Sequence, residues 1–182
     1  LDAPGFGEDF FHKQCIDAIL VNCATNEWWQ YPELPEALSI LQAFSKGWKR
    51  TITFGSSMGG YAAIRFAAAI GAKSSIAVGP QYSPRSSVIP GEIRYDAIVS
   101  HTKFLQECQY TICNSVTNYL VFDPLYSPDN QHVKRYGQEA EIVPIRIFCG
   151  GHTPTIAITQ CGLLPQLLLQ LFYDEFHKSM FR

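Results

Sequence analysis

The chain has 182 residues, of which 47% are apolar, and its 14 Lys and Arg against 16 Asp and Glu give a formal charge of −2. This length and composition suit one packed domain over residues 1–182 and exclude a disordered chain. The balanced charge offers no basic patch for nucleic acid or for an acidic membrane surface, so we expect neither as a partner.

Apolar runs alternate with helical patterns along the chain, which favours βα units around a mainly parallel sheet. We therefore expect a compact three-layer α/β/α sandwich. Residues 81–116 contain Pro and Gly and read as a long insertion, of the kind that often forms a lid or shapes a substrate site. The expected strands are 17–23, 51–54, 75–78, 118–122 and 143–149, and the expected helices are 34–44, 61–70, 102–107, 130–136 and 162–176.

Residues 55–59, Gly-Ser-Ser-Met-Gly, fit the pattern G-x-S-x-G with Ser57 at its centre. A serine hydroxyl is a poor nucleophile and has to be presented to a base. A β-type run precedes the motif and an Ala-rich helical pattern follows it, as a strand-to-helix nucleophile turn requires. We therefore expect Ser57 to be the nucleophile and the N–H of Met58 to be one oxyanion donor. The alternatives are a structural Gly-Ser turn and the neighbouring Ser56, which sits one residue early.

A base and an acid are expected later in the chain, in the order Ser, acid, His. His152 follows a late strand within a Gly-rich loop, where the base would lie. Asp123 ends a strand and Asp129 lies shortly after it, before a short helix that it would also cap. A loop position suits the reach to His152, so we favour Asp129 as the acid and keep Asp123 as the alternative. His132 lies on the same short helix and is a candidate to line the site.

The cysteines and the apolar segments indicate whether the protein binds a metal and where in the cell it is located. Cys149 and His152 form one C-x-x-H, but no convincing second pair completes a zinc site, so we expect no metal. The six cysteines show no small secreted framework, which favours reduced thiols and a cytoplasmic protein. No segment has the order of a signal peptide, and the most apolar stretch, 162–172, is too short to span a membrane. The chain begins at Leu1 rather than Met, which is compatible with a trimmed N-terminus.

Several short motifs resemble a bacterial branch of the α/β-hydrolase superfamily, and the nucleophile elbow is the most specific of them. That branch shares W-[WY]-x before the first long helix, G-x-S-M-G-G-Y, S/G-P-Q after the next strand, D-x-x-H-[AV], and G-G-H near the end. The resemblance covers about residues 17–172. In this chain the motifs read Trp28-Trp29-Gln30, Gly55 to Tyr61, Gly79-Pro80-Gln81, Asp129 to Val133 and Gly150 to His152, with Gly-Leu-Leu following at 162–164.

The resemblance implies a nucleophile at Ser57, an acid at Asp129 and a base at His152, without a cofactor. Members of the branch are sometimes encoded near polysaccharide or glycosyl-transfer functions, which implies a small-molecule or glycan ester as substrate. The superfamily has more strands before the elbow than this chain offers, and its second oxyanion donor comes from that region. Gly5 and Phe6 are the candidates for this donor here.

We expect an esterase-like enzyme that cleaves a carboxylic ester or thioester through an acyl-enzyme. An acyltransferase uses the same residues with an alcohol in place of water, and the short N-terminal part also fits a hydrolase-like binding or accessory protein that has lost catalysis. A peptidase with the same triad is a less favoured alternative. An exposed Leu stripe on the final helix would support a dimer. Candidates for substrate contact are Trp28, Trp29, Gln81 and His132, although the Trp pair is as well explained by packing over the core.

Overall fold

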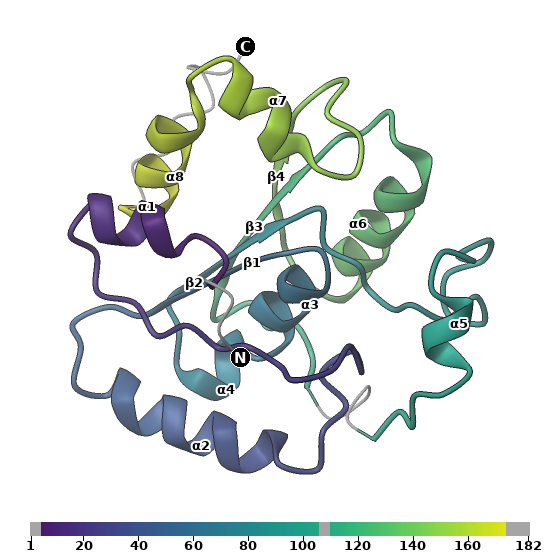
Figure 1. Cartoon of the computed structure of the whole chain (residues 1–182), viewed down its shortest axis with the longest axis horizontal. Helices are drawn as coiled ribbons and strands as arrows, with labels where there is room; N and C mark the ends of the chain where they lie inside the picture. Colours follow the sequence, from purple (N-terminus) through teal and green to yellow (C-terminus); the bar gives the residue numbers. More distant parts are fainter. Residues whose placement is uncertain (1–4, 106–109, 174–182) are drawn as a thin grey trace.

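The computed structural model describes residues 5–105 and 110–173 (Figure 1). The protein is an α/β protein with a four-stranded sheet in the order β1-β2-β3-β4, and all three neighbouring pairs are parallel. Parallel neighbours need a crossover connection between them, and each of the three connections contains at least one helix. The strands are β1, Ile52–Ser56; β2, Ser74–Val78; β3, Thr117–Phe122; and β4, Val143–Arg146. The helices are α1, Glu8–Lys13; α2, Leu34–Ser45; α3, Met58–Arg65; α4, Ala67–Ile70; α5, Asp96–Val99; α6, Ser127–Glu139; α7, Pro154–Gln160; and α8, Leu164–Phe172.

Helices α3 and α6 lie over one face of the sheet. Ala77 and Leu120 point to that face and pack with Ile64 of α3 and with Val133 and Tyr136 of α6. Crossovers of one hand carry successive connecting helices to the same side, which explains why both helices share it. The Ala-rich helical pattern after the elbow is broken at Phe66 into α3 and α4, and α2 packs against α4.

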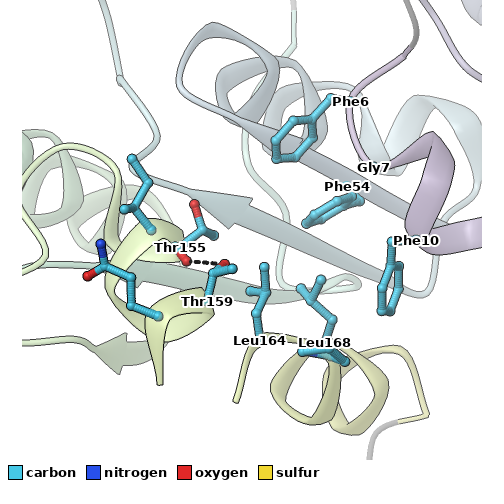
Figure 2. A pocket seen from close by; sticks show the side chains of 11 residues that line it. Phe6, Gly7, Phe10, Phe54, Thr155, Thr159, Leu164 and Leu168 are labelled. Carbon is cyan, nitrogen blue, oxygen red and sulfur yellow. Dashed lines mark hydrogen bonds between the residues drawn. The ribbon is translucent and has the colours of Figure 1, made fainter. Parts of the chain in front are cut away.

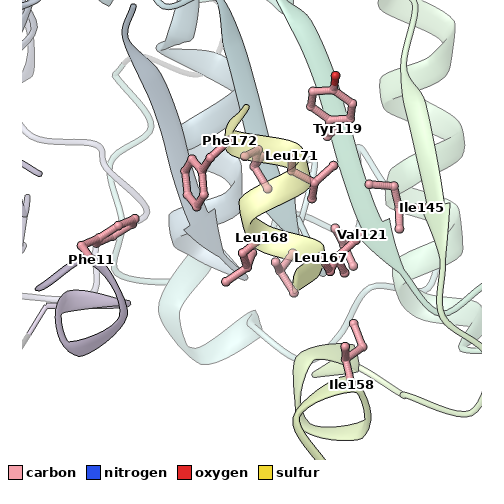
Figure 3. Packing of buried hydrophobic residues seen from close by; sticks show 11 residues of the cluster. Phe11, Tyr119, Val121, Ile145, Ile158, Leu167, Leu168, Leu171 and Phe172 are labelled. Atoms are coloured by element: carbon pink, nitrogen blue, oxygen red, sulfur yellow. The ribbon is translucent and has the colours of Figure 1, made fainter. Parts of the chain in front are cut away.

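The opposite face of the sheet is covered by α1, α7 and α8 (Figure 1). Figure 3 shows the Leu-rich α8 laid against the strands, with Leu167 and Leu171 facing Val121 and Ile145. These strand residues alternate with those that face α3 and α6, because successive side chains of a strand point to opposite faces. Strands covered on both faces read as continuous apolar runs, and this is why β2 and β3 were predictable.

Two expected elements are wrong. Residues 17–23 form an extended segment that pairs with no strand in the described structure; Leu20 packs against the core, but Ile19 and Val21 are exposed. The apolar run was therefore not a sign of burial on two faces. Within the insertion, the short helix is α5 rather than 102–107, of which residues 106 and 107 lie outside the described residues.

Among the described residues, no single helix has the length and apolar character needed to cross a membrane. Helices α7 and α8 reach those limits only when taken together, and they are bent by 117° at the break between them. Most of the apolar side chains of α8 pack against the sheet that it covers.

Candidate active site

The turn after β1 holds Ser57 in a strained conformation. Ser57 is the single residue between β1 and α3, with φ 55° and ψ −120°, a region that residues with a side chain rarely adopt. Its N–H donates to the carbonyl oxygen of Val78 at 2.8 Å, which ties the turn to the end of β2. A Cβ at Gly55 would lie 2.2 Å from the carbonyl oxygen of Gly59, so only glycine fits there. The elbow pattern thus has the geometry that exposes a serine above a sheet.

His152 lies in the loop between β4 and α7 and reaches the serine. Its Nε2 is 3.1 Å from the Oγ of Ser57, and its Nδ1 is 2.7 Å from Oδ2 of Asp129. Because an ionised carboxylate can only accept, Nδ1 carries the proton and Nε2 is left to accept from the serine hydroxyl. The three side chains predicted as nucleophile, base and acid are therefore joined in series.

The two candidate acids have separate positions. Asp129 is in the first turn of α6, with its side chain 1% exposed and directed at the imidazole. Asp123, also buried, accepts from the N–H of Leu125 at 2.8 Å and from the N–H of Gly151 at 2.9 Å. Asp123 thus holds the backbone of the histidine loop, while Asp129 holds the imidazole itself. The side chain of Asp129 makes no cap hydrogen bond for α6, so the alternative capping role does not apply.

A fully buried glutamine also contacts the serine. Gln81 accepts from the Oγ of Ser57 through Oε1 at 3.0 Å and donates from Nε2 to the carbonyl oxygen of Gly79 at 2.9 Å. The carbonyl can only accept, which fixes the amide orientation with Oε1 toward the serine. The serine proton thus has two acceptors within reach, Gln81 and His152. A Cβ at Gly79, whose φ is 50°, would lie 2.5 Å from the carbonyl oxygen of His152, so this residue also has to be glycine.

A buried network of charged side chains lies behind Asp129, and the sequence analysis did not identify it. Arg94 donates from Nη1 to Oδ1 of Asp129 at 2.9 Å. It also donates to Glu92 from Nε to Oε1 and Oε2 at 3.0 and 3.1 Å, from Nη2 to Oε2 at 2.6 Å, and from its backbone N–H to Oε1 at 2.9 Å. Glu92 also accepts from Nε2 of His132 at 2.8 Å. The N–H of Tyr82 donates to Nδ1 of His132 at 2.9 Å, which leaves the proton on Nε2. Arg94 and Glu92 come from the insertion after β2, far from Asp129 in sequence.

The electrostatics of this network follow from burial and pairing. Burial lowers the pKa of His132, and its hydrogen bond to Glu92 offsets this only in part, so the imidazole is neutral. Burial raises the pKa of Glu92, but the hydrogen bonds from Arg94 and His132 outweigh it and leave the pKa below its ordinary range. Burial alone would lower the pKa of Arg94, but the hydrogen bonds to Glu92 and Asp129 raise it above its ordinary value. The guanidinium therefore stays charged.

Three of the four residues expected to contact a substrate are buried away from solvent. Gln81 is fully buried and bonded to the Oγ of Ser57 and the carbonyl oxygen of Gly79. His132 is fully buried and occupied by Glu92 and Tyr82, and Trp28 is 1% exposed and packs edge-on against Tyr95. We correct all three assignments, because none of these side chains offers a surface to a ligand. Trp29 is only half-buried, and its indole N–H donates to the carbonyl oxygen of Met58 at 3.0 Å, which places it beside the elbow.

Of the two candidates for the second oxyanion donor, Gly5 is wrong and Phe6 stays a prediction. The N–H of Gly5 donates to the Glu8 carboxylate at 2.8 Å, so it is already engaged and we withdraw this candidate. Phe6 stacks on Phe54 of β1 with ring centroids 5.0 Å apart. Met58, the first residue of α3, follows Ser57 directly as the motif requires. Residues 1–4 lie outside the described residues.

An apolar pocket lies elsewhere in the protein. It has a volume of about 310 Å³ on the sheet face covered by α1, α7 and α8 (Figure 2). None of Ser57, Asp129 and His152 lines it, so this pocket is separate from the hydrogen-bonded series of the three side chains. Its lining is apolar apart from two threonines and a glutamine: Phe6, Gly7, Phe10, Phe54, Thr155, Ile156, Thr159, Gln160, Leu164, Pro165 and Leu168.

In residues 5–105 and 110–173, no group of three His, Cys, Asp or Glu side chains is placed to hold a metal ion. Comparison of the chain with protein-family models, with curated proteins and with solved structures gives no match.

Proposed function

We propose that this protein is a serine hydrolase that cleaves a carboxylic ester or thioester through an acyl-enzyme. The observation that supports the proposal is the series Ser57–His152–Asp129, with distances of 3.1 and 2.7 Å, built on a strained turn between a strand and a helix. This combination of a strained serine, a base within reach and an acid that orients the base is the recognisable geometry of a catalytic triad.

In the first half of the reaction, the Oγ of Ser57 attacks the carbonyl carbon and its proton passes to Nε2 of His152. Asp129 holds the imidazole in the required tautomer and stabilises the positive charge that develops on it. The N–H of Met58 donates to the oxyanion at the N-terminus of α3, where the helix dipole adds to the effect. His152 then gives its proton to the departing alcohol or thiol, and an acyl group is left on Ser57.

In the second half, His152 takes a proton from water as the water attacks the acyl carbon. Collapse of the second tetrahedral intermediate returns the proton to Ser57 and releases the acid. Gln81 would hold the serine hydroxyl between turnovers, because its Oε1 accepts the same proton that His152 takes.

The parallel sheet with helices on its faces is compatible with a three-layer α/β/α sandwich of the α/β-hydrolase type, which we include in the proposal. The sequence resemblance to a bacterial branch of that superfamily points the same way and suggests a small-molecule or glycan ester. Reduced thiols at the described cysteines would suit the cytoplasmic location that we infer; these are Cys15, Cys23, Cys113, Cys149 and Cys161.

One observation favours a second candidate function. The N–H of Gly5 is engaged by Glu8, so a second oxyanion donor is not assigned from the N-terminal segment. A hydrolase-like binding protein that lacks an efficient oxyanion hole would share the rest of the site. An acyltransferase would retain full activity but pass the acyl group to an alcohol.

Hydrolysis of 4-nitrophenyl esters separates these functions. We expect wild-type protein to release nitrophenol and Ser57→Ala to lose about 10⁴-fold or more in kcat, since the nucleophile is removed. Ser56→Ala is the matched control, because it deletes the adjacent hydroxyl and should keep activity within about threefold. Absence of hydrolysis across a series of acyl lengths in folded wild-type protein would favour the binding protein, and faster nitrophenol release with added sugar alcohols would favour the acyltransferase.

A further inference from the structure

The acid of the proposed triad uses both of its oxygens. Oδ2 of Asp129 accepts from His152, and Oδ1 accepts from Nη1 of Arg94 at 2.9 Å. We propose that Arg94, held by Glu92, is a positioning residue for the triad, which fixes the orientation of Asp129 and sets the electrostatic environment of His152. The inference rests on the proposed function, since it assigns a role within the same site.

Arg94 and Glu92, which we call the clamp, form a rigid pair, so the bond from Arg94 to Asp129 is not a chance contact. Arg94 presents a planar guanidinium whose Nε and Nη2 pair with the two oxygens of Glu92, so Nη1 has one direction left in which to donate. The guanidinium also lies 5.2 Å from the ring centroid of Tyr95 and 5.8 Å from that of Tyr126. An arginine fixed by this many contacts holds the carboxylate it donates to in one rotamer.

The clamp is anchored deep in the protein. The Glu92 side chain is 1% exposed, and its Oε2 accepts from Nε2 of the fully buried His132. His132 in turn accepts from the backbone N–H of Tyr82, four residues after β2 ends. A continuous path of hydrogen bonds therefore runs from the backbone after β2 to the serine, and each carboxylate in it is satisfied on both oxygens.

The charges along this path predict in which direction each clamp residue affects the protonation of His152. Glu92 and Asp129 carry one negative charge each and Arg94 carries one positive charge, so the group is net negative beside His152. Arg94 weakens the attraction that Asp129 exerts on a protonated imidazole, and Glu92 restores part of it.

Other groups also face His152 or its partners, and the test has to leave them unchanged. Tyr126 places its ring 6.4 Å from the imidazole ring, and Gln81 brings Nε2 within 3.5 Å of Nε2 of His152. Asp123 lies behind the loop through its bond to Gly151. Tyr95 is half-buried, and its hydroxyl interacts with the side chain of Ser57.

Substitution of the two clamp residues is expected to move the pH profile in opposite directions. Arg94→Gln removes the positive charge, so the acidic limb of kcat/KM should shift to higher pH by about half to one unit. Glu92→Gln removes a negative charge, so the limb should shift to lower pH by a similar amount. A positioning residue that acts through Asp129 affects kcat more than KM, so kcat should fall about tenfold or more in Arg94→Gln while KM changes less than about threefold.

Two further variants separate charge from geometry. Arg94→Lys keeps the charge but loses the planar fork, so kcat should fall while the acidic limb stays within about 0.3 unit of wild type. Arg135→Gln makes the same charge change at an exposed position on α6, the helix of Asp129, and should alter neither quantity.

The clamp would be overturned if Arg94→Gln and Glu92→Gln both left the acidic limb in place, or if both moved it in one direction. A general loosening of the site would lower kcat in both variants without opposite shifts. Should Arg94→Gln not fold, Glu92→Gln decides alone, because a shift to lower pH is required of it.

Failure of the clamp can be told from failure of the proposed function. If wild-type protein hydrolyses no ester, the titration of the His152 imidazole followed by NMR replaces the pH profile, with His152→Gln used to assign the resonance. Opposite shifts of its midpoint in the two variants would still support the clamp, and equal or absent shifts would overturn it.

Discussion

Two arginines, the buried Arg65 and the partly buried Arg94, link neighbouring parts of this protein, and they differ in which residues they contact. Arg94 joins the insertion after β2 to the first turn of α6 through Asp129. Arg65 of α3 is 4% exposed and pairs with Glu139 in the last turn of α6 at 3.0 Å. The guanidinium of Arg65 also lies 4.4 Å from the ring centroid of Tyr82.

The Arg65 cluster contacts the site through the backbone of Gln81, whereas the Arg94 network reaches the side chains of the proposed triad. The Tyr82 hydroxyl donates to Glu139, and Tyr136 is fully buried and donates to the carbonyl oxygen of Gln81. Contacts from Arg94 lead instead to His152, whose side chain is 30% exposed. Buried charge by itself therefore does not mark a functional site; what distinguishes the Arg94 network is that it ends at an accessible base and a strained serine.

The largest expected effect separates the two aspartates near the histidine loop. Asp129→Asn should lower kcat on a nitrophenyl ester by about 10³- to 10⁴-fold, because an amide can stabilise the wrong imidazole tautomer. Asp123→Asn should cost about tenfold, since it disturbs the backbone at Leu125 and Gly151 but not the imidazole itself. Steady-state kinetics on both purified variants measure the difference. A larger loss in Asp123→Asn would reassign the acid.

The next effect tests whether the Arg65 cluster is structural. Arg65→Met should reduce the free energy of unfolding by about 2 kcal/mol, because Glu139 and Tyr82 lose a buried partner while Glu139 can still reach water. We expect kcat/KM to stay within about threefold of wild type. Urea unfolding and ester hydrolysis of the same sample measure both quantities. A loss of activity without a loss of stability would show that Arg65, like Arg94, acts on the site.

The smallest effect concerns acid stability. Burial holds the pKa of His132 below its ordinary value of about 6.5, so the unfolded chain binds a proton there before the folded chain does. This contribution is fully present above about pH 6.5 and is lost as the pH falls through the folded-state pKa, by up to about 1.4 kcal/mol per pH unit.

His132→Asn removes this titration. Although the variant is less stable at pH 7.5, its free energy of unfolding should fall less steeply between pH 6.5 and 5.5 than that of wild type, as measured by urea unfolding at each pH. Identical slopes would show that His132 does not titrate as its burial implies. Glu92, whose pKa is also lowered, adds a similar loss only at lower pH, below its ordinary range.

The sequence predicted the residues whose roles depend on neighbours within a few positions of the chain. The Gly residues of the elbow are required by contacts within a few residues, such as Gly55 against Gly59, and this makes the motif readable. The Gly-rich loop at His152 and the order of acid and base also follow from chain position. The apolar runs of β2 and β3 predicted a parallel sheet because both faces are covered.

The remaining features depend on contacts between distant segments. Arg94 meets Asp129 across 35 positions of the chain, and no local pattern indicates which carboxylate an arginine will pair with. The same applies to His132, which looked like a site residue by its closeness to Asp129 but faces Glu92 in the interior. Residues 17–23 had the composition of a buried strand, yet only Leu20 packs against the core.

The most direct test of the central claim is reaction with a fluorophosphonate probe, which modifies a serine activated by a neighbouring base. We predict that folded wild-type protein gains one covalent adduct on Ser57, that Ser56→Ala is labelled equally, and that His152→Ala is labelled far more slowly. Absence of labelling in folded wild-type protein, or labelling that survives Ser57→Ala, would contradict the account.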